Sequence, residues 1–103
     1  QQRELRALRA RLQEAPRDLA RAVDVARRYI EAGRREADPR YYGYAQAALG
    51  PWWGLAAPPP PVRLLRATLL QSEHRFPEAL ADLTGLTAQQ PDNAQAWLTR
   101  ATV

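Results

Sequence analysis

Apolar residues recur every three or four positions along much of the chain, which is the spacing of amphipathic helices. Residues 2–14 and 18–32 show the pattern most clearly. The positions that share one face are Leu5, Leu8 and Leu12 in the first stretch and Leu19, Val23, Ala26 and Ile30 in the second. Alternation with a period of two is absent, so the sequence predicts an all-α fold without strands.

Glycine and proline predict where the helices end and begin. Gly33 predicts the end of the second helix, and the Asp38-Pro39 pair predicts the start of a third that runs to Leu49. The segment 50–60 begins GPWWG and is rich in proline, so no continuous helix is expected through it. The prolines at 58–61 predict a local polyproline II conformation.

Three more helices are expected in the second half of the chain, which brings the total to about six. One spans residues 61–73, and Pro77 opens the next, which continues to residue 89. The last begins after Pro91, with Asp92 as its cap and Gln95 placed for a capping-box contact.

The spacing of small and large apolar residues repeats over a longer distance. Ala67 and Ala101 lie thirty-four residues apart, and Leu70, Phe76 and Leu83 follow Ala67 at the intervals of a helix–turn–helix unit. This pattern resembles the tetratricopeptide repeat, whose period is about 34 residues. Three positions depart from it, because Ala22 replaces the usual aromatic residue, Arg66 stands where leucine is typical and Gly85 is expected to weaken its helix.

The resemblance implies antiparallel helix hairpins that stack as a right-handed α-solenoid within a single domain. On this alignment residues 1–16 are the second helix of a preceding repeat, 17–60 are a repeat with insertions, 61–93 are a repeat, and 94–103 are the first helix of a following repeat. The first and last helices would then leave apolar surface exposed and favour self-association. The chain contains no methionine, which indicates a mature fragment or an excised domain.

The resemblance also implies a function in protein–protein interaction, as a scaffold or assembly module that binds an extended peptide or helix in a concave groove. Matching the family position by position, the groove residues would be Val23, Arg27, Ile30, Glu31, Leu64, Thr68, Gln71 and Leu98. Arg27 lies between two apolar positions of its helix and suits a carboxylate or a backbone carbonyl of the ligand. It is equally placed to pair with Asp24 or Glu31 on a solvated face.

The residues offer little for catalysis. The chain has no cysteine or lysine and a single histidine, His74, next to ordinary surface residues. No metal-ligand spacing or phosphate-binding loop is present, so we expect no enzymatic activity, no metal and no cofactor. The exclusive use of arginine as the basic residue indicates a GC-rich, bacterial genome, while the compartment stays undetermined.

The charge is uneven along the chain. Residues 1–50 hold eleven arginines and seven acids, whereas residues 51–103 hold four of each. The alternative function is therefore a basic module that faces RNA or a membrane. Nucleic acid is the less favoured partner, because Arg3 and Arg6 can share a helix face whereas Arg9 and Arg11 are expected to spread around the helix as on a solvated surface.

Aromatic residues cluster between positions 41 and 53. Tyr41, Tyr42 and Tyr44 belong to the third helix, and Trp52 and Trp53 follow it. They are expected to pack against the helix pair and the proline-rich connection. The alternative is that some of them stay exposed and anchor a partner, since tyrosine, tryptophan and arginine are enriched at binding hot spots. Trp52 and Trp53 are therefore the secondary candidate site.

Overall fold

The structure is a computed structural model that describes residues 2–103. All of its regular elements are helices, as the sequence predicts, and no strand occurs in the described residues. The chain divides into two compact units, one ending at Leu55 and the other beginning at Ala56. None of the helices in residues 2–103 combines the length and apolar character of a membrane span.

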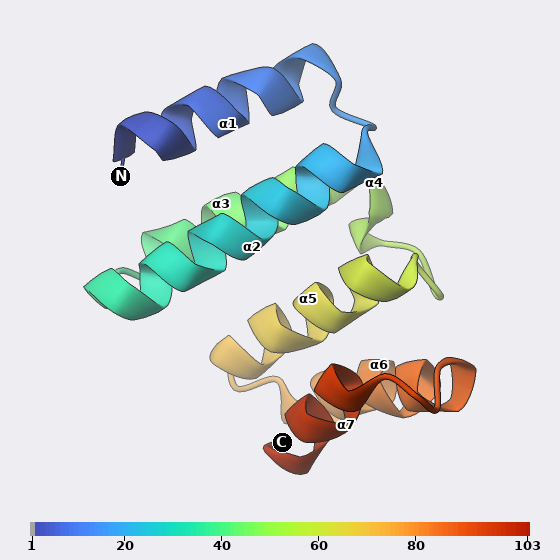
Figure 1. Ribbon diagram of the computed structural model, residues 1–103. Coiled ribbons are helices and arrows are strands. Elements are labelled where there is room, and N and C mark those ends of the chain that lie inside the picture. The colour runs from blue at the N-terminus through green and yellow to red at the C-terminus, as the bar shows by residue number, and fades with distance from the viewer. Residues whose placement is uncertain (1) are drawn as a thin grey trace. The chain divides into compact units, whose positions relative to one another are not determined.

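The first unit contains three helices that pack side by side and a short fourth (Figure 1). They are α1 (Gln2–Glu14), α2 (Leu19–Glu36), α3 (Arg40–Ala48) and α4 (Gly50–Trp53). Helix α2 is the centre of the unit, because it packs against α1 on one side and forms an antiparallel hairpin with α3 on another. Its start is capped by Asp18, whose carboxylate accepts a hydrogen bond from the Arg21 backbone N–H at 3.2 Å.

The second unit is a smaller set of three helices. They are α5 (Pro60–Ser72), α6 (Phe76–Gln89) and α7 (Ala94–Ala101). Helices α5 and α6 form an antiparallel hairpin, and α7 packs against α6 (Figure 1). Helix α6 begins next to Pro77 as predicted, since a proline in the first turn removes only an N–H that has no partner within the helix.

The helix count was predicted too low by one, since the described residues form seven helices. The additional helix is α4, which occupies residues 50–53 of the segment expected to be irregular and has Pro51 in its first turn. The prediction of polyproline II at 58–61 was also wrong in part. Pro59 has φ −51° and ψ 144°, but Pro60 and Pro61 already belong to the first turn of α5, where their fixed φ suits a helix.

Gly33 does not end α2, which continues for three more residues to Glu36. The helix ends at Ala37, which adopts the left-handed conformation with φ 52° and ψ 42°. Gly33 has a packing role instead, because a Cβ atom there would lie 2.8 Å from the Cε1 atom of Tyr42 on α3. Glycine thus permits the close approach of the α2–α3 hairpin.

The cap of the last helix was assigned to the wrong residue. The side chain of Asn93, not Asp92, accepts a hydrogen bond from the Ala96 backbone N–H at 3.0 Å. Helix α7 therefore begins one residue later than Asp92 would require, and the expected capping-box contact of Gln95 does not form around that cap.

The apolar surface expected at the two ends of the chain is found at one of them. In α7, Trp97 and Leu98 are 45% and 64% exposed. In α1, by contrast, Leu5 and Leu12 are buried and Leu8 is half-buried. The exposed apolar stripe expected on α1 was therefore wrong, because these leucines already have a surface to pack against in the α1–α2 contact.

The interior of the second unit contains a charged cluster that the apolar pattern did not suggest. Asp82 on α6 is 6% exposed and receives two hydrogen bonds from Arg66 on α5, at 2.8 Å from Nε and 2.5 Å from Nη2. The Nε atom of Arg63 lies 3.5 Å from the same carboxylate. That nitrogen is buried and has no hydrogen-bond partner among the described residues. Two guanidinium groups thus enclose one carboxylate.

Gly85 makes room for this cluster. A Cβ atom at this position would lie 2.6 Å from the Cζ atom of Arg63. The glycine was expected only to weaken its helix, yet α6 runs without interruption from Phe76 to Gln89. Because glycine has no side chain, the Arg63 guanidinium can lie against α6 at this position.

Candidate functional site

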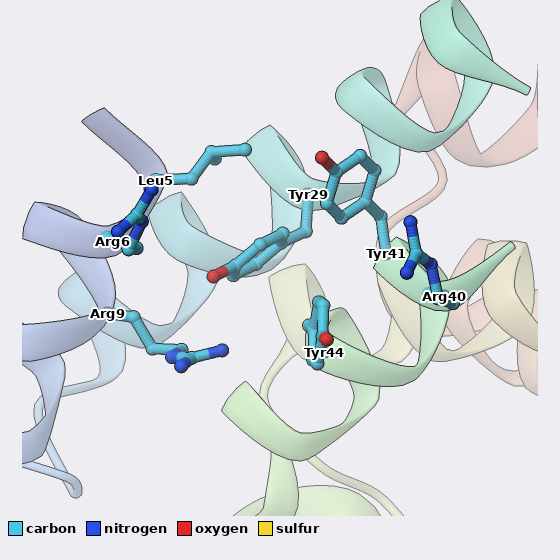
Figure 2. A pocket seen from close by; sticks show the side chains of 7 residues that line it. All are labelled: Leu5, Arg6, Arg9, Tyr29, Arg40, Tyr41 and Tyr44. Carbon is cyan, nitrogen blue, oxygen red and sulfur yellow. The ribbon is translucent and has the colours of Figure 1, made fainter. Parts of the chain in front are cut away.

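A cavity of about 280 Å³ opens between α1, α2 and α3 in the first unit (Figure 2). We call it the tyrosine–arginine pocket, since three residues of each kind line it together with a leucine. The lining residues are Leu5, Arg6, Arg9, Tyr29, Arg40, Tyr41 and Tyr44. Helix α1 contributes the leucine and two of the arginines, α2 contributes Tyr29, and α3 contributes the rest.

The three tyrosines that line the pocket form one aromatic cluster. The ring centroids of Tyr29 and Tyr44 lie 5.4 Å apart, those of Tyr29 and Tyr41 5.9 Å, and those of Tyr41 and Tyr44 6.2 Å. Such tilted pairs suit the quadrupoles of aromatic rings. Tyr29 and Tyr41 are buried, whereas Tyr44 is 42% exposed. Two rings of the cluster therefore belong to the core, and the third is partly accessible to solvent.

The arginines at the pocket differ in their local contacts. Arg9 extends from α1 toward α3 and places its Cζ atom 5.3 Å from the centroid of the Tyr44 ring, within the range of a cation–π contact (Figure 2). Arg40 is held by Asp38, with Nη2 2.7 Å from Oδ2 and Nε 3.0 Å from Oδ1. These hydrogen bonds lower the pKa of the Asp38 carboxyl and raise the pKa of Arg40.

A second hollow, of about 370 Å³, lies between α1 and α2. It is lined by Glu4, Leu5, Leu8, Asp24, Arg27, Arg28 and Glu31. Its charges are mixed, with three acids and two arginines, and Arg28 already pairs with Asp24 at 3.3 Å. The tyrosine–arginine pocket has no acidic residue in its lining. Of the two hollows, it is the one that offers a net positive charge to a ligand.

The groove residues predicted in the first unit divide by burial. Val23 and Ile30 are 8% and 4% exposed and belong to its core. Arg27 and Glu31 are exposed and line the mixed-charge hollow together. No hydrogen bond or ion pair joins Arg27 to another described residue, and Asp24 pairs with Arg28 instead. Arg27 therefore remains available for the ligand contact that the sequence suggested.

The groove residues predicted in the second unit lie on α5 and α7. Leu64 and Thr68 are half-buried, and the Thr68 hydroxyl donates to the Leu64 carbonyl at 3.0 Å. Gln71 donates from Nε2 to the carbonyl of Thr102 at 3.3 Å, so it links the end of α5 to the end of α7. Leu98 is largely exposed and is the apolar residue of this set that is free to meet a partner.

The secondary candidates, Trp52 and Trp53, both lie on α4. Each is half-buried, which leaves part of each indole accessible while the rest packs. The sequence offered packing and partner binding as alternatives for the aromatic cluster. The structure divides that cluster, since Tyr41 and Tyr44 belong to the pocket and the two tryptophans do not line it.

Sequence reasoning missed the pocket as a unit. Arg9 was expected to lie away from the face that Arg3 and Arg6 can share, yet Arg6 and Arg9 both line this one cavity. Their spacing of three residues puts them on the same side of a helix, next to Leu5, which is the signal that was available. Arg40 and Tyr29 could not be assigned to the site because their meeting with α1 depends on how three helices pack.

Comparison with known proteins identifies no relative. The chain matches no protein-family model, no curated protein and no solved structure. The described residues also contain no group of three or more histidine, cysteine, aspartate or glutamate side chains arranged to hold a metal ion.

Proposed function

We propose that the chain is a protein-interaction module and that it binds a peptide or a helix of a partner protein. The observation that carries the proposal is the tyrosine–arginine pocket, where the partly exposed Tyr44 ring lies next to Arg6 and Arg9. Tyrosine and arginine are the residue types enriched at binding hot spots, because they combine a large contact area with directional hydrogen bonds.

The proposal includes the finer fold assignment that the sequence spacing suggests. In it, the α2–α3 and α5–α6 hairpins are successive repeats of a tetratricopeptide-like, right-handed solenoid. The antiparallel hairpins and the small residues buried at corresponding positions, Ala26 and Ala67, support this assignment. Repeat modules of this kind present side chains from several helices to a ligand, and the proposal assigns no catalytic reaction to the chain.

The test is selection of peptides from a random displayed library on the immobilised full chain. Each selected peptide is then synthesised, and its binding in solution is measured by calorimetry beside a scrambled peptide of the same composition. We expect the selected sequence, and not the scrambled one, to bind. If no selected peptide binds in solution, the proposal is wrong.

Mapping by nuclear magnetic resonance then locates the binding face. Amide shifts around Arg9 and Tyr44 would place the ligand in the tyrosine–arginine pocket. Shifts around Arg27, Thr68, Gln71 and Leu98 would place it on the groove that the family resemblance implies. Affinity that falls steeply with salt and is matched by random RNA would favour the basic alternative instead.

A further inference from the structure

We propose that the tyrosine–arginine pocket recognises an acidic residue of the bound peptide, whose carboxylate accepts hydrogen bonds from Arg6 and Arg9 while a neighbouring side chain packs on Tyr44. This inference rests on the proposed function, because it names the kind of peptide that the module binds. It assigns the ligand's charge to one cavity in the first unit.

The pocket has donors without a carboxylate of their own. Arg40 is engaged by Asp38 through both oxygens of the carboxylate. No hydrogen bond or ion pair links Arg6 or Arg9 to any other residue that the structure describes. Each guanidinium carries five N–H donors in a fixed plane that fits a carboxylate through two parallel hydrogen bonds. The charge of these two residues is therefore available for a ligand.

The contact of Arg9 with Tyr44 prepares it for this role. A cation–π contact draws on the charge of the guanidinium and the face of the ring, and it uses none of the N–H donors. It also limits the freedom of a long side chain that otherwise loses conformational entropy when it binds. The tyrosine cluster thus holds one guanidinium beside the partly exposed Tyr44 ring before a ligand arrives.

The surroundings favour one acidic side chain over a polyanion. The cavity is about 280 Å³, at the lower end of the range of about 300–1,000 Å³ for small-molecule sites. The adjoining hollow between α1 and α2 has three acids against two arginines, so the positive charge of the pocket does not continue along a path for a phosphate backbone. Two of the three tyrosines are buried and offer no face on which bases could stack. A peptide places a single charge without these conflicts.

The experiment uses three blocked peptides that differ only at the acidic positions. The first has a central Glu-Phe-Glu sequence between glycine and serine, the second has Gln-Phe-Gln, and the third replaces the first glutamate with phosphoserine. Acetylated and amidated ends remove the terminal charges. Each is titrated to millimolar concentration into the isotope-labelled full chain, and the Nε–H signals of Arg6 and Arg9 and the ring signals of Tyr44 are followed.

We expect the glutamate peptide to shift these signals and to bind at least about tenfold more tightly than the glutamine peptide, since each charge-assisted hydrogen bond lost is worth about that factor. The double variant R6Q/R9Q should lose about tenfold or more. The matched control is R3Q/R11Q, which removes the same charge from exposed positions of α1 outside the pocket and should change the affinity by less than about twofold.

Several results would overturn the inference while leaving peptide binding intact. These are equal affinity for the glutamate and glutamine peptides, an equal loss in the two double variants, or library-selected peptides that bind without shifting the pocket signals. Phosphoserine binding more than about tenfold tighter than glutamate would overturn the assignment to a carboxylate. Unchanged circular dichroism melting of R6Q/R9Q shows that the variant is folded.

Discussion

The α2–α3 hairpin packs tyrosine, alanine and glycine between its helices, whereas the α5–α6 hairpin encloses the Asp82 carboxylate between Arg63 and Arg66. Both hairpins contain a glycine inside a helix, and both glycines receive a side chain from the opposite helix. At Gly33 that side chain is the Tyr42 ring, and at Gly85 it is the Arg63 guanidinium. A helical glycine therefore makes room for an aromatic side chain in one hairpin and for a charged side chain in the other.

The comparison shows what sets the cost of a change in each hairpin. An aromatic interface is stabilised by the area it buries and tolerates partial repacking. A buried charge cluster has no such tolerance, because removing its one carboxylate leaves two desolvated guanidinium groups with less compensating negative charge. The α5–α6 hairpin should therefore respond more sharply to the loss of a single atom group than the α2–α3 hairpin does.

The largest effect is expected from Asp82→Asn, which keeps the shape of the side chain and removes the charge that Arg63 and Arg66 share. Breaking a buried ion pair in this way typically costs about 3–5 kcal/mol. We expect the free energy of unfolding of the second unit to fall by this amount, as measured by hydrogen exchange of the α5 and α6 amides.

Two further variants sharpen that measurement. Asp92→Asn makes the same charge change at an exposed position and should have almost no effect. Replacement of Arg63, Arg66 and Asp82 together by leucine or methionine should restore most of the stability, since apolar residues of similar volume often replace buried ion pairs without loss. If Asp82→Asn is as mild as Asp92→Asn, the two hairpins do not differ as proposed.

The next effect is expected from Gly33→Ala in the aromatic hairpin. The added Cβ would meet Tyr42 at 2.8 Å and the Asp38 carbonyl at 3.3 Å, so the tyrosine ring or the backbone next to it must shift. Overpacking of this kind costs about 1–3 kcal/mol. Urea unfolding of the full chain, followed through the amides of α2 and α3, measures the loss.

Gly43 provides the internal control for this prediction. It lies in α3 and is exposed, and a Cβ atom added there would meet no neighbouring element within 4 Å, so the position is open to a methyl group. Gly43→Ala should stabilise the helix by about 0.5–1 kcal/mol because alanine loses less conformational entropy. Opposite signs at Gly33 and Gly43 are expected, and a stabilising Gly33→Ala would contradict the close approach.

A smaller effect is expected from Gly85→Ala in the charged hairpin. The methyl group would displace the Arg63 guanidinium, whose Cζ atom lies 2.6 Å from the Cβ position, but the end of a long side chain moves more easily than a ring. The intrinsic preference of helices for alanine opposes the clash. We expect a net loss of about 1 kcal/mol in equilibrium unfolding.

The background of Arg63→Ala separates the two contributions. Without the guanidinium, Gly85→Ala should become stabilising by about 0.5–1 kcal/mol, the value for an open helical glycine. The change of sign between the two backgrounds is the measured quantity. Destabilisation of the same size in both would assign the glycine a role unrelated to Arg63.

Local patterns in the sequence were sufficient to predict most of the helices, because apolar spacing and proline act within one turn. The start of α6 at Pro77 follows from such a pattern, whereas Val23 and Ile30, which the family resemblance assigned to a ligand groove, are buried. The packing roles of the two helical glycines could not be predicted in this way, since each depends on a side chain from the opposite helix. Gly33 was interpreted as a helix end and Gly85 as a weak point for this reason.

The candidate site was predicted less well than the fold, for a related reason. Tyr41 and Tyr44 were identified as an aromatic group, and Arg6 as a basic one, but nothing local in the sequence joins them. They meet because α1 and α3 both pack against α2, which carries Tyr29 between them (Figure 2). The cap of α7 is a smaller example. Asp92 and Asn93 are both residue types that cap helices well, and only the backbone conformation decides which of them does so.

The smallest effect concerns the exposed ion pair of the first unit, which contrasts with the buried cluster of the second. Hydrogen bonds from Arg40 hold the pKa of Asp38 below its ordinary value of 3.8. Because the folded pKa is lowered, the contribution of the pair is present above about pH 4, the pKa of an unfolded aspartate, and is lost as the pH falls through the folded value.

Arg40→Gln should raise the Asp38 pKa toward 3.8 in a carbon-detected titration and leave stability at neutral pH nearly unchanged, since exposed ion pairs contribute little. Arg35→Gln, at an exposed position that has no ion pair with Asp38, is the control and should leave that pKa in place. If both variants raise the Asp38 pKa equally, the general positive charge of the unit, and not the Arg40 hydrogen bonds, lowers that pKa. A large loss of stability from Arg40→Gln would remove the contrast between the exposed Arg40–Asp38 pair and the buried cluster around Asp82.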